Sequence, residues 1–319
     1  MSKFDLSRRQ FVSVMGTAAA VAGLGLAGCG NTGNDSSASD NGGDGSSTLM
    51  GSISCSGATS FQPLVEAAAD AFMEANPETS IAISAGGSGQ GLSQIADGSV
   101  QIGRSDVYAE EKLEASQCEG LVDNQVCIVG MGPIVNAGVD VDDLTLDQLK
   151  GIFLGEITDW SEVGGTAGTI QVIQREAGSG TRATFEAAVL GGETAPDSFR
   201  PVAEVDSSGT VVEQVAATDG SISYVAFNYM EGDGIKALTV DGVEPTQANV
   251  ESGDFTIWAY EHMYTRSDED EATAAVTQAF IDYIMSEDVQ STTVIEQGFI
   301  PVSNMKVKKD VDGNVTPVE

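Results

Sequence analysis

Residues 169–189 read TIQVIQREAGSGTRATFEAAV, and the class of the fold can be predicted from this segment. The segment Thr169–Ile173 predicts a β-strand, and the pattern after the turn predicts a helix that runs through Val189. The turn itself, Gly178-Ser-Gly-Thr181, is rich in glycine and hydroxyl residues. A strand that leads through a short turn into a helix is the building unit of α/β proteins.

The same alternation of strands and helices extends over the chain from Leu49 onward. The sequence predicts further strands at 52–56, at 80–85, around Ile102, at 126–135 and at 222–227. It predicts further helices at 61–76, 92–97, 144–153 and 272–286. Thr145 is the expected N-cap of one of these helices, and the acidic run Asp268–Glu271 lies where the dipole of another favours negative charge. Such alternation predicts an α/β fold with mostly parallel sheets.

The chain is strongly acidic. Its 319 residues include 48 Asp and Glu against 14 Lys and Arg, so the formal net charge is −34. Nucleic acids and anionic membranes repel such a surface, which excludes binding of either through a basic patch. A single histidine, His262, and four cysteines leave little material for a transition-metal centre or a histidine-based catalytic site. The length predicts two domains or one large one, with enough apolar residues for a sizeable core.

The N-terminus carries two export signals in order. Ser7-Arg-Arg-Gln-Phe-Val12 matches the twin-arginine motif, and an apolar run over residues 12–27 follows it. That run is short for a transmembrane helix, which needs about 20 apolar residues. It ends in Leu26-Ala-Gly-Cys29, which resembles the bacterial lipobox, so we expect residues 1–28 to be a signal peptide and Cys29 to be lipidated. A simple anchor helix and a cleaved signal without lipid are the alternatives.

Residues 30–48 contain no apolar residue larger than alanine. Such a segment cannot bury enough surface to offset the entropy of ordering it, so a flexible linker is predicted over 29–48. Of the remaining cysteines, Cys55 and Cys127 lie in apolar runs and are expected to be small buried hydrophobic residues. A disulfide between Cys118 and Cys127 is compatible with export, and the sequence leaves it open.

Three turns share the composition of Gly178–Thr181; the other two are Ser56–Ser60 and Gly86–Gly91. Each lies between a predicted strand and a helix, where the unpaired N–H groups of a helix N-terminus bind anions and hydroxyls add neutral donors. By itself each turn fits an ordinary helix cap, but three of them, with Arg175 nearby, predict that they converge on one oxyanion. None has the lysine of a P-loop or the spacing of a dinucleotide-binding turn. No metal-ligand cluster or nucleophile–base pair accompanies them, and His262 and both tryptophans are expected to be packing residues.

Four segments of the sequence are similar to one known family. They are Leu144–Leu149 (LTLDQL), Ile152–Trp160 (IFLGEITDW), Arg175–Arg182 (REAGSGTR) and Gly298–Val302 (GFIPV). Together they make the chain resemble, over most of its length, the phosphate-binding protein of the bacterial and archaeal high-affinity phosphate ABC transporter. The resemblance implies a two-lobe, periplasmic-binding-protein-like α/β fold of type II, with mixed, mostly parallel sheets.

The resemblance also implies how the chain is divided. Lobe 1 would comprise residues 49–135 plus 227–319, and lobe 2 would comprise residues 136–226. Two crossing segments, near Pro133–Ala137 and Ala226–Tyr229, would form the hinge, with the ligand in the cleft between the lobes.

Eight residues match the phosphate contacts of the family position by position. They are Thr59, Ser60, Ser88, Asp106, Arg175, Ser179, Gly180 and Thr181. The chain departs from some relatives at two places. It carries Arg104-Ser-Asp106 where some have Ser-Ser-Arg, which leaves open whether Arg104 faces ligand or solvent. It also carries Ala177 where some have an aspartate that could pair with Arg175.

Asp106 provides a physical argument for specificity. Phosphate near neutral pH still carries protons, whereas sulfate does not. An ionised carboxylate only accepts hydrogen bonds, so it can accept one from a P–OH group but meets only lone pairs on sulfate. A buried polar group left unpaired in this way can discriminate strongly between two ligands. The alternative reading makes Asp106 the N-cap of the next helix.

The resemblance implies an extracytoplasmic lipoprotein, held at the outer face of the cell membrane through Cys29. It would capture inorganic phosphate and deliver it to the permease subunits of an ABC transporter. This function includes no catalytic residue, cofactor, metal or nucleic-acid partner. A receptor for sulfate, molybdate or tungstate is the first alternative. An exported phosphatase, and an adhesion or signalling lipoprotein that uses the lobes as a scaffold, are the others.

Overall fold

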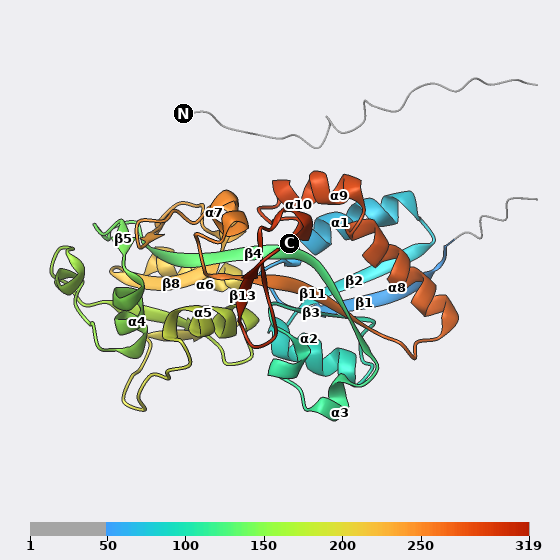
Figure 1. Ribbon diagram of the computed structural model, residues 1–319, viewed down its shortest axis with the longest axis horizontal. Helices are drawn as coiled ribbons and strands as arrows, with labels where there is room; N and C mark the ends of the chain where they lie inside the picture. Colours follow the sequence, from blue (N-terminus) through green and yellow to red (C-terminus); the bar gives the residue numbers. More distant parts are fainter. Residues whose placement is uncertain (1–48, 319) are drawn as a thin grey trace, which may run out of the picture. The chain divides into compact units, whose positions relative to one another are not determined.

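The computed structural model describes residues 49–318 (Figure 1). The predicted signal peptide, the predicted lipidation site Cys29 and the predicted linker to residue 48 lie outside these residues. Among the described helices, none is long and apolar enough to cross a membrane. From Gly51 onward, strands and helices alternate, and the fold is α/β as expected.

A nine-stranded sheet runs through the described residues in the order β2-β1-β3-β11-β4-β8-β6-β7, with β9 paired to β4. One half of this sheet contains β1 (Gly51–Gly57), β2 (Thr79–Ala85) and β3 (Ile102–Ser105). The other half contains β6 (Gln171–Arg175), β7 (Ala203–Val205) and β8 (Ser221–Ala226). Within each half these strands pair in parallel, as predicted.

Two long strands join the halves of the sheet. β4 (Leu121–Asn136) pairs antiparallel with β11 (Trp258–Arg266) up to Gly130, and with β8 from Met131 onward. β11 also pairs antiparallel with β3, which makes the sheet mixed. β11 was not predicted from the sequence. Its side chains are buried on both faces, so it lacks the polar alternation by which a half-buried strand is recognised.

The longer helices cover both faces of the sheet. They are α1 (Gln62–Ala75), α2 (Gly87–Ala96), α4 (Leu146–Leu154), α5 (Gly180–Leu190), α6 (Ser208–Ala217) and α8 (Glu271–Ile284). In one half, α1 and α8 pack together on β1 and β2, and α2 packs on β1 and β3 from the opposite face (Figure 1). In the other half, α5 and α6 pack against β6 and β8. Thr145 caps α4 as predicted, and Asp270, within the acidic run, caps α8.

The predicted helix at 92–97 begins earlier, at Gly87, so the glycine-rich turn forms the first turns of α2. The reason is the close packing of this helix on the backbone of β1 and β3. A Cβ atom on Gly91 would lie 2.6 Å from the Arg104 carbonyl oxygen and 2.8 Å from the Gly57 Cα. A glycine is therefore required inside α2, and the glycine content that suggests a loop reflects tertiary contact instead.

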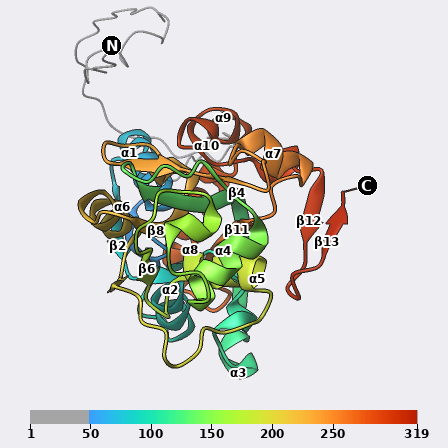
Figure 2. The same ribbon diagram turned by 90° about the vertical axis from the view of Figure 1, so that its left-hand side faces the viewer.

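Shorter elements complete the described chain. They are β5 (Asp143–Leu144), β9 (Ile235–Ala237), β10 (Thr239–Val240), β12 (Val307–Lys309), β13 (Val315–Pro317), α3 (Ala115–Cys118), α7 (Gln247–Ser252), α9 (Glu287–Ser291) and α10 (Thr293–Glu296). β9 pairs with the end of β4 and β10 pairs with β5, so residues 235–240 pack beside the segment predicted as lobe 2. The predicted lobe boundaries stay predictions. The β12–β13 hairpin lies at one edge, next to the C-terminus (Figure 2).

Several predicted packing residues lie in the core. Trp160 and Trp258 are both buried, as are Cys55 and Cys127. In the described chain Cys118 and Cys127 are free thiols, so the disulfide that the sequence left open is not formed. Burial raises the pKa of Cys55 to about 11, which makes this thiol a poor nucleophile at neutral pH.

Candidate anion-binding site

The predicted anion-binding residues come together where β1, β2, β3 and β6 end. Within one half of the sheet, the parallel strands β1, β2 and β3 place their carboxyl ends at the same edge, so the turns that follow them meet there. The turn after β6 belongs to the other half and reaches these turns through the contacts of Thr181 with Asp106 and of Gly89 with Gly178. All eight side chains or backbones are buried: Thr59, Ser60, Ser88, Asp106, Arg175, Ser179, Gly180 and Thr181. The hydroxyl-bearing turns end at the N-termini of α2 and α5, which supply unpaired N–H groups.

Asp106 is the centre of a hydrogen-bond network that links both halves. The Ser60 hydroxyl donates to its Oδ1 at 2.5 Å, and the Thr181 hydroxyl donates to its Oδ2 at 2.7 Å. Its backbone N–H donates to the Ser88 hydroxyl at 3.0 Å. The next helical turn is capped by Tyr108 instead, so the alternative reading of Asp106 as an N-cap is wrong. Asp106 thus acts as a buried acceptor.

Arg175 lies beside this network and is 1% exposed. Its Nη2 donates to the Asp206 carbonyl oxygen at 2.9 Å and to the Thr59 hydroxyl at 3.4 Å, and its Nη1 donates to the Ser208 hydroxyl at 3.3 Å. Its Nε has no partner in the described chain, and no carboxylate forms a salt bridge with it there. Burial lowers the pKa of this guanidinium, against the opposing effect of the Asp106 charge.

Ser208 belongs to the site, and the sequence analysis missed it. It is fully buried at the start of α6, and its backbone N–H donates to the Thr59 hydroxyl at 3.2 Å. The two hydroxyl oxygens of these residues also lie 3.2 Å apart. The signal was available, because Ser207–Thr210 (SSGT) has the same composition and the same strand-to-helix position as the three turns that were recognised.

Arg104 does not face the solvent. It is fully buried, its Nη2 donates to the Ser84 carbonyl oxygen at 2.5 Å, and its guanidinium lies over the Phe61 ring, 6.0 Å from the ring centroid. Its Nε and Nη1 have no partner in the part of the chain that the structure describes. The buried carboxyl group of Glu261, which the sequence analysis did not single out, is nearby.

A cavity of about 390 Å³ lies beside the predicted anion-binding residues. Its lining includes Thr59 and Glu176, together with Ser179 at the start of α5. At its wall the two halves of the sheet touch through the backbone, since the Gly89 N–H donates to the Gly178 carbonyl oxygen at 3.0 Å. The site is therefore enclosed by segments that are distant in sequence.

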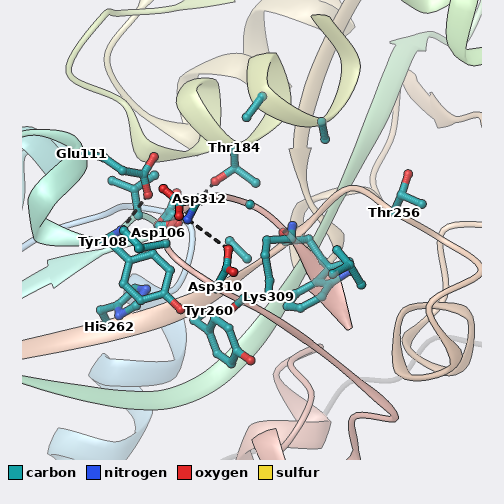
Figure 3. Close-up of a pocket in the computed structure, with 18 residues that line it drawn as sticks. Asp106, Tyr108, Glu111, Thr184, Thr256, Tyr260, His262, Lys309, Asp310 and Asp312 are labelled. Atoms are coloured by element: carbon teal, nitrogen blue, oxygen red, sulfur yellow. Dashed lines mark hydrogen bonds between the residues drawn. The ribbon is translucent and has the colours of Figure 1, made fainter. Parts of the chain in front are cut away.

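Asp106 also lines a second cavity of about 420 Å³ (Figure 3). Tyr260, His262 and Lys309 line it, together with the turn of the β12–β13 hairpin. Lys309 Nζ lies over the Trp258 ring, 4.2 Å from the ring centroid, and burial lowers its pKa to about 8. His262 is buried and stacks on a neighbouring tyrosine ring, so it packs as predicted.

Comparison with known proteins agrees with this geometry. Residues 42–288 match the PBP superfamily domain. The phosphate-binding protein PstS of Bacillus subtilis is 45% identical over 287 residues, which cover 90% of this chain and 93% of that protein. A phosphate ABC transporter substrate-binding protein from Clostridium perfringens, solved with bound phosphate, is 33% identical with a TM-score of 0.72, over 79% of this chain and 100% of that one. An ABC-type phosphate transport receptor from Vibrio cholerae is 27% identical with a TM-score of 0.62, over 78% and 99%. The chain therefore belongs to the PstS family of phosphate-binding proteins, within the PBP superfamily.

Proposed function

We propose that this chain captures one inorganic phosphate ion at the eight candidate residues and delivers it to the permease of a phosphate ABC transporter. The observation that carries this proposal is the Arg175 guanidinium, which is buried without a salt-bridge partner in the described chain. A buried cation without a counter-ion is strongly unfavourable. A bound oxyanion supplies both the charge and the acceptor that Nε lacks.

The groups around Arg175 are suited to an anion because most of them are neutral donors. Ser88 and Ser179 lie at the N-termini of α2 and α5, where backbone N–H groups point outward. Thr59, Ser60 and Thr181 add hydroxyl groups that can turn toward the ion. These groups bind phosphate as cargo, and no bond is made or broken.

Asp106 favours phosphate over the other tetrahedral oxyanions. Each of its carboxylate oxygens accepts one hydrogen bond from a hydroxyl, Ser60 on one side and Thr181 on the other. Each oxygen has a second lone pair, which can accept a hydrogen bond from a P–OH group. Sulfate, fully deprotonated at neutral pH, has no proton to offer and would meet the carboxylate as a like charge. A receptor for sulfate, molybdate or tungstate therefore fits these residues less well than a phosphate receptor.

We infer that capture occurs by closure of two lobes, residues 49–135 plus 227–319 and residues 136–226, about the two crossing segments. The contacts between Thr59 and Ser208, and between Gly89 and Gly178, join these predicted lobes across the cleft. Hinge closure of this kind buries the ion and completes its hydrogen bonds.

We further propose an extracytoplasmic location, with the mature chain held to the membrane by lipid on Cys29 and a linker over 29–48. The twin-arginine motif and the lipobox support this proposal. Mass spectrometry of the N-terminal peptide from the membrane fraction should find a lipid-modified Cys29. In the Cys29→Ser variant the protein should leave that fraction, and retention there would contradict the anchor.

The binding proposal is tested by calorimetric titration of anion-stripped protein with phosphate and then sulfate. We expect one phosphate per chain, bound far more tightly than sulfate. Asp106→Asn should gain sulfate affinity, because an amide can donate to an oxyanion where a carboxylate cannot. Equal affinity of the unaltered protein for both ions would refute the role of Asp106. No binding of either ion would refute the function.

A further inference from the structure

Glu261 is a fully buried acid that the proposed binding contacts do not use. It lies in β11, opposite Cys127 of β4, at a point where the register between these strands shifts. Its side chain is 0% exposed, and neither carboxyl oxygen receives a hydrogen bond from any donor of the described chain. An ionised carboxylate in such a place would lose its hydration without compensation.

The polar neighbours of Glu261 show why it lacks a donor. β11 pairs with β3 so that His262 lies opposite Ser105, which places Glu261 and Asp106 next to each other at the end of this ladder. The Asp106 carboxyl group and the Ser60 hydroxyl both act on Glu261, but that hydroxyl donates to Asp106. Arg104 is close enough to act through its charge, yet it forms no salt bridge with Glu261, and its Nη2 donates to the Ser84 carbonyl oxygen. Two further titratable groups face Glu261. They are the Cys127 thiol of β4 and the Tyr229 hydroxyl of the segment after β8.

Two adjacent buried carboxyl groups cannot both be ionised at ordinary cost, so such a pair holds a proton. Burial and the Asp106 charge both raise the pKa of Glu261 well above its usual value. Asp106 already accepts hydrogen bonds on both oxygens, which suits the ionised member of the pair. A protonated Glu261 would have one O–H donor, and the Asp106 carboxylate is the acceptor beside it.

We propose that Glu261 is a positioning residue that stays protonated at neutral pH and donates its proton in a hydrogen bond to Asp106. This inference rests on the proposed function, in which Asp106 reads the proton of phosphate. The bond holds the Asp106 carboxylate in place and keeps it an acceptor. It also leaves the surroundings of Asp106 without a second negative charge, which would repel the bound anion.

Infrared spectroscopy tests the protonation state directly and does not depend on phosphate. At pH 7 we expect the carbonyl stretching band of a protonated carboxyl group in the unaltered protein. The band should be lost in Glu261→Gln and retained in Glu66→Gln, which makes the same charge change at an exposed position of α1. A spectrum of the unaltered protein without this band, or a band that persists in Glu261→Gln, overturns the proposal.

Phosphate titration of two variants tests the positioning role. Glu261→Gln keeps a donor and should bind phosphate within about threefold of the unaltered protein, while Glu261→Leu should lose about tenfold or more, the effect of removing a hydrogen bond to a charged group. The ratio of phosphate affinity to sulfate affinity should fall in the leucine variant only.

If both variants bind phosphate like the unaltered protein, or if the glutamine variant binds as weakly as the leucine variant, the positioning role is refuted. If Glu261→Leu does not fold, the phosphate affinity of Glu261→Gln and the infrared band still test the proposal. Failure of the unaltered protein to bind phosphate would count against the proposed function alone, because the band is read without ligand.

Discussion

Replacement of Gly180 by alanine should prevent the site from closing. A Cβ atom on Gly180 would lie 2.1 Å from the Ser88 hydroxyl oxygen, 2.8 Å from the Ser88 Cβ and 3.0 Å from the Asp106 Cβ. Rotation of the hydroxyl could relieve the first contact but neither of the others. Gly180 begins α5, where alanine has a higher helix propensity than glycine, so the helix itself should not be destabilised. The clash acts between segments of the two predicted lobes.

The size of this effect follows from the cost of overpacking, about 1–3 kcal/mol. If it falls entirely on the closed state, phosphate affinity should drop by about 5- to 150-fold, since each 1.4 kcal/mol is a factor of ten. The matched control is Gly178→Ala, because a Cβ atom there would have no neighbour within 4 Å. Calorimetric titration of both variants at one pH gives the comparison.

Two results would contradict this reasoning. Equal affinity of Gly180→Ala and Gly178→Ala would mean that the two segments do not approach each other in the phosphate complex as they do here. A large loss in Gly178→Ala would mean that the backbone at this turn, and not the approach of Ser88, limits binding. Thermal unfolding without phosphate should be similar for both variants and separates a binding defect from a folding defect.

Three further predictions concern the charge of Arg175, the hydroxyl group of Ser208 and the effect of pH on Lys309. Arg175→Met should lower phosphate affinity by about 30-fold or more, the effect of removing one partner of a buried charge pair. The phosphate-free protein should stay as stable or become more stable, because a buried cation without a salt-bridge partner in the described chain is removed. A melting-temperature shift as large as that of the unaltered protein at the same phosphate concentration would contradict this. Ser208→Ala should weaken phosphate binding about fivefold, through loss of a hydrogen bond to Arg175 and of contact with Thr59, and an unchanged affinity would remove Ser208 from the site. Lys309 has a pKa lowered by burial from 10.5 to about 8, so between these values the unfolded chain binds a proton that the folded chain does not, and stability should rise with pH. In urea unfolding from pH 7 to 10.5, the free energy of unfolding should therefore increase relative to that of Lys309→Met, and a constant or decreasing difference would refute the assignment.

Most of the fold could be predicted because its signals are local. The periodicity around Phe61 and the cap at Thr145 depend on residues within a few positions, and the structure contains both helices. Some elements, among them α6 and β7, were not predicted, and for two of the differences the cause is tertiary. β11 was not predicted because its side chains are buried on both faces, so the sequence lacks the alternation of polar and apolar residues. The start of α2 was predicted too late because Gly91 is needed for close packing of the helix on β1 and β3, and glycine usually indicates a loop.

The candidate site could be predicted in part. The eight residues match a family pattern. Their turns are rich in glycine, serine and threonine, and this composition predicts helix N-termini. Ser208 had the same composition but lay outside that pattern. No sequence signal pointed to the inward orientation of Arg104 or to Glu261, since both depend on which strands become neighbours.

The family, the α/β class and the chemistry of an anion site built from neutral donors and one arginine follow from the amino-acid sequence alone. These properties reside in short segments whose conformation and hydrogen-bonding groups are set by nearby residues. The tertiary contacts determine that Asp106 accepts hydrogen bonds from both Ser60 and Thr181. They also determine that no carboxylate of the described chain forms a salt bridge with Arg175, and that the buried Glu261 carboxyl group lies next to Asp106. Asp106 and Thr181 are more than 70 residues apart in the chain, and they meet because β4 and β11 pair over a long range. No local sequence pattern predicts such a contact.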